Sequence, residues 1–315
     1  METTLPKLID QFLEYLEIEK NCSKLTIRDY RHYLEVFSDW YSSTLSHKTI
    51  HDLDLYVIRR YRVFLTTKVD IQGRSLGKAT QNYYVIALRS FLRYLMKNDI
   101  KTLEPSKIDL PKAESHSLKF LERAQVEQLV TQPDTSTLEG MRDRAILELL
   151  FSTGLRVSEL VSLNSQQINF ERREFGIIGK GRKERIVFVS DRAAEWVKRY
   201  LDAREDKFKP LFIRYSGVVI EDEEGEKMRL TARSIERIVK KYVHSARLPV
   251  DATVHTLRHS FATDLLTNGA DIRSVQEMLG HKNIATTQIY THITNKQLRE
   301  VHEAFHSGNK DDDSL

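Results

Sequence analysis

Two segments in the middle of the sequence place basic side chains where they can do chemistry. Arg156 lies between the apolar residues Leu155 and Val157, at the start of an expected amphipathic helix. Lys180 lies between two glycines at the tip of an expected β-hairpin, where glycine permits a positive φ and close approach of the backbone. A guanidinium is planar, always protonated and suited to oxyanions, and an ammonium can donate a proton. Both residues are therefore candidates for charge stabilisation or proton transfer.

Two further segments add histidines and a tyrosine. His255 and Arg258 are three residues apart, which places them on one face of an expected helix. The sequence Leu-Gly-His at residues 279–281 is followed nine residues later by Tyr290. Histidine changes its charge near neutral pH and can act as an acid or a base, and a tyrosine hydroxyl can act as a nucleophile. Each of these residue types alone is more often structural, and only their ordered combination indicates catalysis.

A metal site is an alternative use of the histidines. His255 and His259 have the i, i+4 spacing of metal-binding helices, and His281 or His292 could complete a site. The zinc-protease helix, however, requires a glutamate directly after the first histidine, and this segment contains no carboxylate. The sequence therefore predicts no bound metal and no other cofactor.

The composition places these segments in a folded chain of about two domains. The chain has 315 residues, against roughly 150 for a typical domain. Hydrophobic residues make up 40% and charged residues 30%, which excludes a disordered chain and a membrane protein. The longest apolar run, residues 145–151, contains a glutamate and falls far short of the roughly 20 residues of a membrane helix. The N-terminus lacks a secretory signal, and the single Cys22 excludes an internal disulfide, so we expect a cytoplasmic protein.

The net charge is weak evidence for a nucleic-acid partner. The formal charge is +4, and residues 1–113 hold the whole excess, with 18 Lys and Arg against 14 Asp and Glu. Residues 114–315 are balanced at 31 of each sign and include the acidic run at residues 221–224. Charge alone does not decide the kind of partner.

The spacing of apolar residues predicts a mainly helical chain. Helices are expected over residues 5–19, 24–41, 53–65 and 78–98, with basic residues on their polar faces. Prolines within residues 105–117 predict a linker. Further helices are expected at residues 122–130, 142–152, 191–202, 231–244, 255–268, 272–279 and 295–306. The β-rich runs are residues 167–170, 174–178 and 185–189, and residues 217–228 are expected to form an acidic surface hairpin or loop.

Arg156, Lys180, His255, Arg258, His281 and Tyr290, in this order and at these spacings, resemble the catalytic set of the tyrosine recombinase (phage integrase) family, and most of all its simple Xer-type members. The resemblance covers nearly the whole chain. It implies a mainly α fold with a helical DNA-clamping domain at residues 1–104 and a linker at 105–117. It also implies a mostly helical catalytic domain with a small antiparallel sheet at residues 118–306, with an exchange helix at 295–306 and a disordered tail at 307–315.

The resemblance also implies a role for each candidate. Arg156 and Arg258 would neutralise the charge that grows on the scissile phosphate, which fixed guanidinium forks do well. Tyr290 would attack the phosphorus to give a 3′-phosphotyrosine that conserves the bond energy, so that neither ATP nor a high-energy cofactor is needed, and the two arginines would do without a metal. Lys180 would protonate the leaving 5′-oxygen, His255 would accept or relay the tyrosine proton, and His281 would donate a hydrogen bond to the phosphate.

The implied partners follow from the same resemblance. The expected partner is a double-stranded DNA recombination site, bound by a homotetramer whose C-terminal helices are exchanged between subunits, with a second recombinase or an activator as a further candidate. Acting on chromosomal DNA would place the protein at the nucleoid. The candidate DNA contacts are Lys24, Arg28, Arg31, Arg89, Arg93, Arg182 and Lys183. The sequence is equally compatible with two interpretations of Arg182, Lys183 and Arg185, as phosphate contacts or as solvated turn residues.

Several functions stay open at this level. The resemblance favours Xer-like resolution of chromosome or plasmid dimers, and the absence of an extra arm-binding domain before the clamp helices favours a simple recombinase over a large phage integrase. Integration and excision of a small mobile element is the alternative. A type IB topoisomerase-like activity and a non-catalytic DNA-binding relative are the remaining ones.

Overall fold

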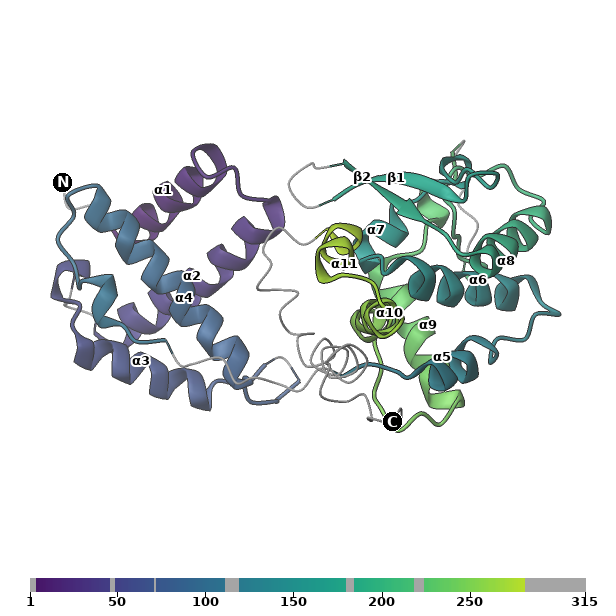
Figure 1. Cartoon of the computed structure of the whole chain (residues 1–315). Coiled ribbons are helices and arrows are strands. Elements are labelled where there is room, and N and C mark those ends of the chain that lie inside the picture. The colour runs from purple at the N-terminus through teal and green to yellow at the C-terminus, as the bar shows by residue number, and fades with distance from the viewer. Residues whose placement is uncertain are drawn as a thin grey trace, which may run out of the picture. The chain divides into compact units, whose positions relative to one another are not determined.

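The computed structural model describes residues 4–45, 49–70, 72–110, 119–179, 184–217 and 224–280. The chain divides into two compact units, Met1–Ser115 and His116–Leu315 (Figure 1). Each unit has a hydrophobic core of its own. In the described ranges there are eleven α-helices and one sheet of two antiparallel strands. The expectation of a mainly helical fold with a small sheet is confirmed.

The N-terminal unit is a bundle of four helices with two short 3₁₀ turns. Its elements are α1 (Leu5–Ile18), α2 (Lys24–Thr44), η1 (Ile50–Asp52), α3 (Leu55–Thr67), α4 (Lys78–Lys97) and η2 (Pro105–Lys107). The side chain of Ser23 accepts a hydrogen bond from the Thr26 N–H and thereby caps α2, and Asp54 caps α3 in the same way. Phe12 and Phe91 pack with ring centroids 5.6 Å apart in the core between α1 and α4.

The C-terminal unit arranges helices around one long buried helix. Its elements are α5 (Arg123–Val130), α6 (Leu138–Thr153), α7 (Val157–Val161), η3 (Ser165–Gln167), β1 (Glu174–Ile178), β2 (Glu184–Phe188), α8 (Asp191–Asp202), η4 (Glu226–Met228), α9 (Ala232–Ser245), α10 (Val254–Thr267) and α11 (Ile272–Leu279). The predicted helices of this unit are found, except that the helix expected from residue 142 begins four residues earlier, and that residues 295–306 lie outside the described part.

Helix α6 is buried on all sides, which makes it the centre of the C-terminal core. Its buried charges are neutralised by ion pairs. Arg142 pairs with Asp143 at 2.6 Å, and Glu148 pairs with Arg144 at 2.8 Å and with Arg192 of α8 at 2.8 Å. Buried charges persist in a protein interior only with such partners, so these pairs fix α6 against its neighbours.

The sheet is a hairpin whose inner face packs on this core. Ile177 of β1 lies opposite Arg185 of β2 in the antiparallel register. Val187 and Ile177 are buried, whereas Ile186 and Phe188 are exposed on the outer face. Successive side chains of a strand alternate between faces, so Arg185 shares the inner face with Val187.

The prediction of a strand at residues 167–170 is wrong. Residues 165–167 form the 3₁₀ turn η3, and Asn169 makes only an isolated bridge with Glu174. The physical reason is the side chain of Asn169, whose Oδ1 accepts a hydrogen bond from the Arg172 N–H and turns the chain into β1.

The acidic segment at residues 217–228 is described only in part. Residues 224–228 include the 3₁₀ turn η4, which begins after Gly225. Gly225 has a φ of +71°, and the Phe208 ring packs directly against it. Glu224 pairs with Lys209 at 3.1 Å. Among the helices of the described ranges, none has the length and apolar character needed to cross a bilayer.

Candidate active site

Arg156 is held at the start of α7 by one carboxylate. It is the N-cap residue of that helix, and its side chain is 27% exposed. The backbone N–H donates to Oε2 of Glu159 at 2.8 Å, and Nη1 donates to Oε1 of the same residue at 2.8 Å. The other terminal nitrogen, Nη2, donates to the carbonyl of Gly280 at 3.4 Å. Arg156 therefore reaches from α7 to the end of α11 while part of its guanidinium stays accessible.

Arg258 reaches the same place from α10. Its side chain is buried, and Nη1 donates to the carbonyl of Gly154 and Nη2 to the carbonyl of Leu279, each at 2.5 Å. The two candidate arginines thus bind consecutive carbonyls, those of Leu279 and Gly280, at the C-terminal end of α11. The negative end of the helix dipole favours cations there. The structure therefore brings together two guanidiniums that are 102 positions apart in the sequence.

Gly154 makes this convergence possible. It ends α6 in the left-handed region, with a φ of +58°. A Cβ at this position would lie 2.5 Å from Cδ1 of Phe261 and 3.2 Å from a methyl group of Leu279. Only glycine allows the close approach of α10 and α11 that places the Gly154 carbonyl within reach of Arg258.

His255 lies one turn before Arg258 on α10 and is exposed. Partial burial, together with the nearby charges of Arg258 and then Arg156, holds the pKa of His255 below its usual value. His259, one turn after it, has its ring centroid 6.2 Å from that of His255. Burial, followed by His255 and Arg258, lowers the pKa of His259 to about 4. Both rings are therefore mainly neutral near pH 7, and His255 is able to accept a proton.

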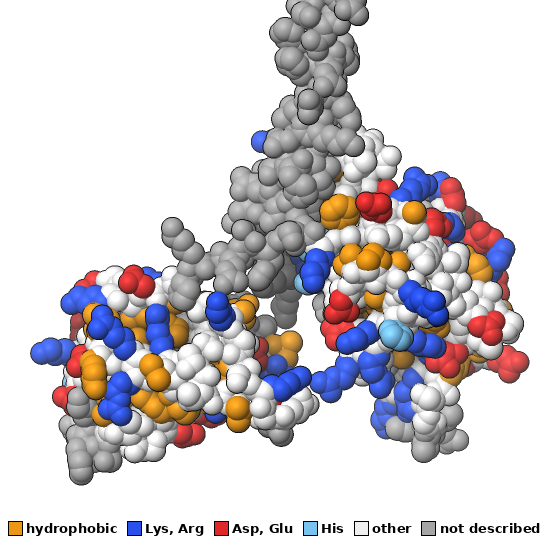
Figure 2. Space-filling view, turned by 90° about the horizontal axis from the view of Figure 1, so that it is seen from below, with side chains coloured by type: hydrophobic (Ala, Val, Ile, Leu, Met, Phe, Trp, Pro, Cys, Tyr) orange, Lys and Arg blue, Asp and Glu red, His pale blue; other side chains and the backbone are white. Residues whose placement is uncertain are grey.

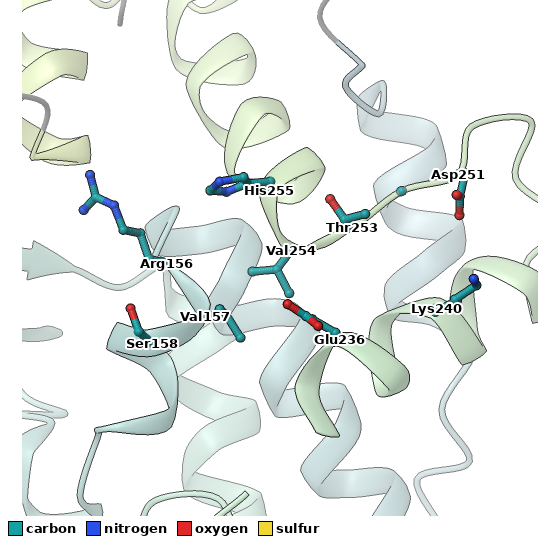
Figure 3. Close-up of a pocket in the computed structure, with 10 residues that line it drawn as sticks. Arg156, Val157, Ser158, Glu236, Lys240, Asp251, Thr253, Val254 and His255 are labelled. Carbon is teal, nitrogen blue, oxygen red and sulfur yellow. The ribbon is translucent and has the colours of Figure 1, made fainter. Parts of the chain in front are cut away.

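A pocket of about 540 Å³ opens beside these groups (Figure 3). Arg156 and His255 lie at one end of it, while Glu236, Lys240 and Asp251 lie toward the other. The wall is formed by the first residues of α7 and α10 and by the outward face of α9. The guanidinium and the imidazole thus border one solvent-accessible space.

Three of the six predicted catalytic residues are not placed. Lys180, His281 and Tyr290 lie outside the described residues, as do Arg182, Lys183 and His292. Among the described residues, no group of three or more His, Cys, Asp or Glu side chains is arranged to hold a metal ion. Arg156, Arg258 and His255 are therefore the members of the set whose mutual arrangement is seen.

Glu159 and Arg185 are two members of the cluster that sequence reasoning missed. The side chain of Arg185 is only 12% exposed and pairs with Glu159 at 3.0 Å, so its interpretation as a solvated turn residue is wrong, and the phosphate contact stays a prediction. The alternation of β2 offered a signal, because it places Arg185 on the same face as the buried Val187. Glu159 offered the capping spacing, three residues after the N-cap Arg156.

The candidate DNA contacts of the N-terminal unit fall into two groups. Lys24 and Arg93 are exposed and Arg89 is half-buried. Arg28 pairs with Asp29 and Arg31 pairs with Asp10, each at 2.8 Å, so part of their charge is compensated within the chain. Figure 2 shows Lys and Arg side chains interspersed with hydrophobic ones on the N-terminal unit and gathered near histidine on the C-terminal unit.

Comparison with protein families matches both units. Residues 119–297 match the phage integrase family, and residues 9–99 match the N-terminal SAM-like domain of phage integrases. The chain belongs to the phage integrase family. The matches cover the helical bundle and the whole of the described candidate site of this tyrosine recombinase.

Curated relatives resemble the recombinase over almost its full length. Tyrosine recombinase XerD of Lacticaseibacillus casei is 38% identical over 306 residues, covering 95% of this chain and 98% of the relative. Tyrosine recombinase XerC of Pelotomaculum thermopropionicum is 37% identical, covering 95% and 97%. Tyrosine recombinase XerD of Pseudomonas putida is 36% identical, covering 95% and 97%.

Solved structures share the fold of the recombinase. The XerH site-specific recombinase bound to its palindromic difH substrate in a post-cleavage complex gives a TM-score of 0.68 at 24% identity, covering 95% of this chain and 85% of that one. The Tn1549 transposon integrase in complex with transposon right end DNA gives a TM-score of 0.69 at 17% identity, covering 93% and 99%.

Proposed function

We propose that this protein is a site-specific DNA recombinase that cleaves and rejoins strands through a 3′-phosphotyrosine formed by Tyr290, in Xer-like resolution of chromosome or plasmid dimers. The observation that carries the proposal is the meeting of Arg156 and Arg258 on the consecutive carbonyls of residues 279 and 280. Two fixed guanidiniums in one place suit a phosphodiester, whose non-bridging oxygens gain negative charge during displacement.

The reaction follows from the chemistry of the residues. The hydroxyl oxygen of Tyr290 forms a bond to phosphorus, and the bond from phosphorus to the 5′-oxygen breaks. Lys180 gives a proton to the leaving 5′-oxygen, and His255 takes the proton of the phenol, for which its lowered pKa leaves it unprotonated near pH 7. The 5′-hydroxyl of another strand then attacks the phosphotyrosine and restores a phosphodiester. The ester conserves the energy of the broken bond, so the proposed reaction uses no ATP. The guanidiniums of Arg156 and Arg258 stabilise the charge that a metal would otherwise neutralise, so no metal is used.

The assembly belongs to the proposal as well. Residues 1–104 would clamp the DNA and residues 118–306 would carry out the reaction, joined by the linker at 105–117. Four copies would hold two duplexes, each passing the helix at residues 295–306 to a neighbour. Such a complex would act on chromosomal DNA at the nucleoid in the cytoplasm, with a second recombinase or an activator as a further partner. Support comes from membership of the family and from the basic side chains of α2 and α4.

The decisive experiment traps the covalent intermediate. A labelled duplex that carries a nick just 3′ of the cleavage point loses the short fragment that begins with the free 5′-hydroxyl, and the protein stays attached to the 3′ end of the labelled strand. We expect a protein–DNA adduct on denaturing gels, which persists in EDTA and disappears in Tyr290→Phe. Tyr83→Phe, which alters an exposed tyrosine of the N-terminal unit, is the matched control. An adduct that survives Tyr290→Phe, or that requires a divalent metal, would overturn the proposal.

Sequencing the trapped DNA decides between the recombination roles. Adducts at one chromosomal or plasmid site agree with dimer resolution, whereas adducts at the ends of a small mobile element would replace that role with integration and excision. Relaxation of supercoiled DNA without exchange of strands between two sites would instead indicate a topoisomerase-like enzyme.

A further inference from the structure

The strand that follows the Lys180 segment carries an arginine on its inner face. Arg185 lies on β2, five residues after Lys180 in the chain, opposite the buried Ile177. Its side chain is 12% exposed, too little for a charge that is hydrated by bulk water. A guanidinium in this position needs a specific anionic partner.

That partner is the carboxylate that also holds Arg156. Glu159 is buried, with 6% of its surface exposed. Its Oε1 accepts from Nη1 of Arg185 at 3.0 Å and from Nη1 of Arg156 at 2.8 Å. Its Oε2 accepts from Nη2 of Arg185 at 3.0 Å and from the backbone N–H of Arg156 at 2.8 Å. One buried carboxylate is thus shared between a bidentate Arg185 and the end of α7.

The ionisation of Glu159 depends on Arg185. Burial raises the pKa of the Glu159 carboxyl, but hydrogen bonds from Arg185 and then from Arg156 outweigh the burial, so that its pKa lies below the usual value. The carboxylate is charged near neutral pH and attracts both guanidiniums. Arg185 occupies one half of the hydrogen-bonding capacity of the Glu159 carboxylate. This leaves a single side-chain hydrogen bond between Arg156 and Glu159.

Arg185 also touches the last residue before His281. A Cβ on Gly280 would lie 2.7 Å from Nη1 and 3.1 Å from Cζ of Arg185, so the guanidinium lies directly against this glycine. The carbonyl of Gly280 accepts from Arg156. Arg185 is therefore in contact with the two groups that fix the position of Arg156, namely Glu159 and Gly280.

We propose that Arg185 is a positioning residue for the cleavage step, which occupies one half of the Glu159 carboxylate so that Arg156 presents its free N–H groups to the scissile phosphate. The inference rests on the proposed function. Without Arg185, both oxygens of Glu159 become available to Arg156, and a bidentate pair between them withdraws the guanidinium from the DNA. Arg185 thus acts through Arg156 and does not contact the substrate itself.

The first test compares Arg185→Ala with a matched arginine. Arg192 pairs at 2.8 Å with Glu148, which is also buried, but on the α8 side of α6. We expect Arg185→Ala to slow single-turnover cleavage of the nicked duplex on the order of 10- to 100-fold, with unchanged affinity for the duplex in a gel-shift assay. Arg192→Ala also loses a pair to a buried carboxylate but keeps the cleavage rate. Equal rates for Arg185→Ala and the wild type overturn the inference.

The second test asks whether the effect passes through Arg156 and the phosphate charge. On a duplex whose scissile phosphate is an uncharged methylphosphonate, a guanidinium has less charge to stabilise, so the defect of Arg185→Ala shrinks. The double variant Arg156→Ala/Arg185→Ala cleaves within about threefold of Arg156→Ala alone. Arg156→Ala already removes the guanidinium that Arg185 positions, so the loss of Arg185 has no further effect. Additive defects, or an equal defect on the neutral phosphate, would show a merely structural role.

Two further measurements keep the test decisive. If Arg185→Ala does not fold, Arg185→Lys replaces it, because lysine keeps the charge but cannot form the bidentate fork; the same non-additivity with Arg156→Ala is expected. An adduct formed by the wild type but not by Tyr290→Phe shows that the proposed function stands, whatever Arg185→Ala does. If the wild type itself forms no adduct, the proposed function fails and the inference with it.

Discussion

Replacing Gly154 by alanine tests how the two arginines are brought together. The position combines a φ of +58° with a space in which a Cβ would lie 2.5 Å from Cδ1 and 3.0 Å from Cε1 of Phe261. Its carbonyl is also an acceptor for Arg258. A single methyl group therefore strains the backbone, displaces the Phe261 ring and moves the carbonyl that holds Arg258.

The expected cost has two parts. The left-handed conformation of an L-residue costs about 1 to 2 kcal/mol, and overpacking against a ring within the folded unit costs about 1 to 3 kcal/mol. Together the free energy of unfolding of the C-terminal unit falls by about 2 to 5 kcal/mol. Movement of the Gly154 carbonyl also displaces Arg258, so cleavage falls by roughly 10- to 100-fold at temperatures where the variant is folded.

Denaturant unfolding and single-turnover cleavage measure the two effects. Gly269→Ala is the control, because this residue also has a positive φ, +96°, but nothing lies within 4 Å of an added Cβ. Gly269→Ala should lower the free energy of unfolding only through the strain of its backbone conformation, and it should cleave at the wild-type rate. If Gly154→Ala and Gly269→Ala are equally stable and equally active, the close approach of α10 and α11 at Gly154 does not position Arg258.

Three more outcomes are expected. Arg156→Ala and Arg258→Ala each lower the rate of adduct formation at least on the order of 100-fold, as removal of preorganised charge stabilisation does; near-normal cleavage by both would contradict their assignment. Burial lowers the pKa of His259 to about 4 in the folded chain from the ordinary 6.5 of a histidine. The folded state is therefore not penalised above pH 6.5 and loses stability as the pH falls toward 4. The free energy of unfolding should therefore drop by roughly 1 to 2 kcal/mol between pH 6.5 and 5, and His259→Asn should flatten this dependence in denaturant titrations. Ser260→Ala removes the hydroxyl that accepts from the Leu121 N–H at 2.8 Å, and the unpaired buried donor should cost about 1 to 3 kcal/mol in the same titrations without changing the affinity for DNA.

The helices were predictable because their signals are local. The cap Ser23 fixes the first residue of α2, and the apolar spacing of α4 fixes its length to within one residue. The start of α6 was missed although Thr137 caps its first turn and Leu138 packs against the core. The false strand at residues 167–170 has suitable residue types, but the Asn169 side chain bonds locally and turns the chain.

The site was predictable in its residue types but not in its contacts. The ordered set of Arg156, His255 and Arg258 can be found in the sequence, since each has a typical neighbour or spacing. The pairing of Arg185 with Glu159 spans 26 residues and exists only after β2 packs beside α7. The sequence of this basic segment did not distinguish Arg185 from its neighbours, because charge in a sequence does not say which side of a strand faces the interior.

The carbonyls that hold the arginines belong to the backbone. Substitution at positions 154, 279 or 280 changes a side chain but leaves these oxygens in the chain. Evolution can therefore alter the surroundings of the guanidiniums without deleting what they bind, provided that the path of the main chain is kept. Substitutions at positions 154, 279 or 280 that impair this recombinase should do so through the size of the new side chain or a change in the backbone torsion angles. Loss of a hydrogen-bond acceptor should contribute nothing.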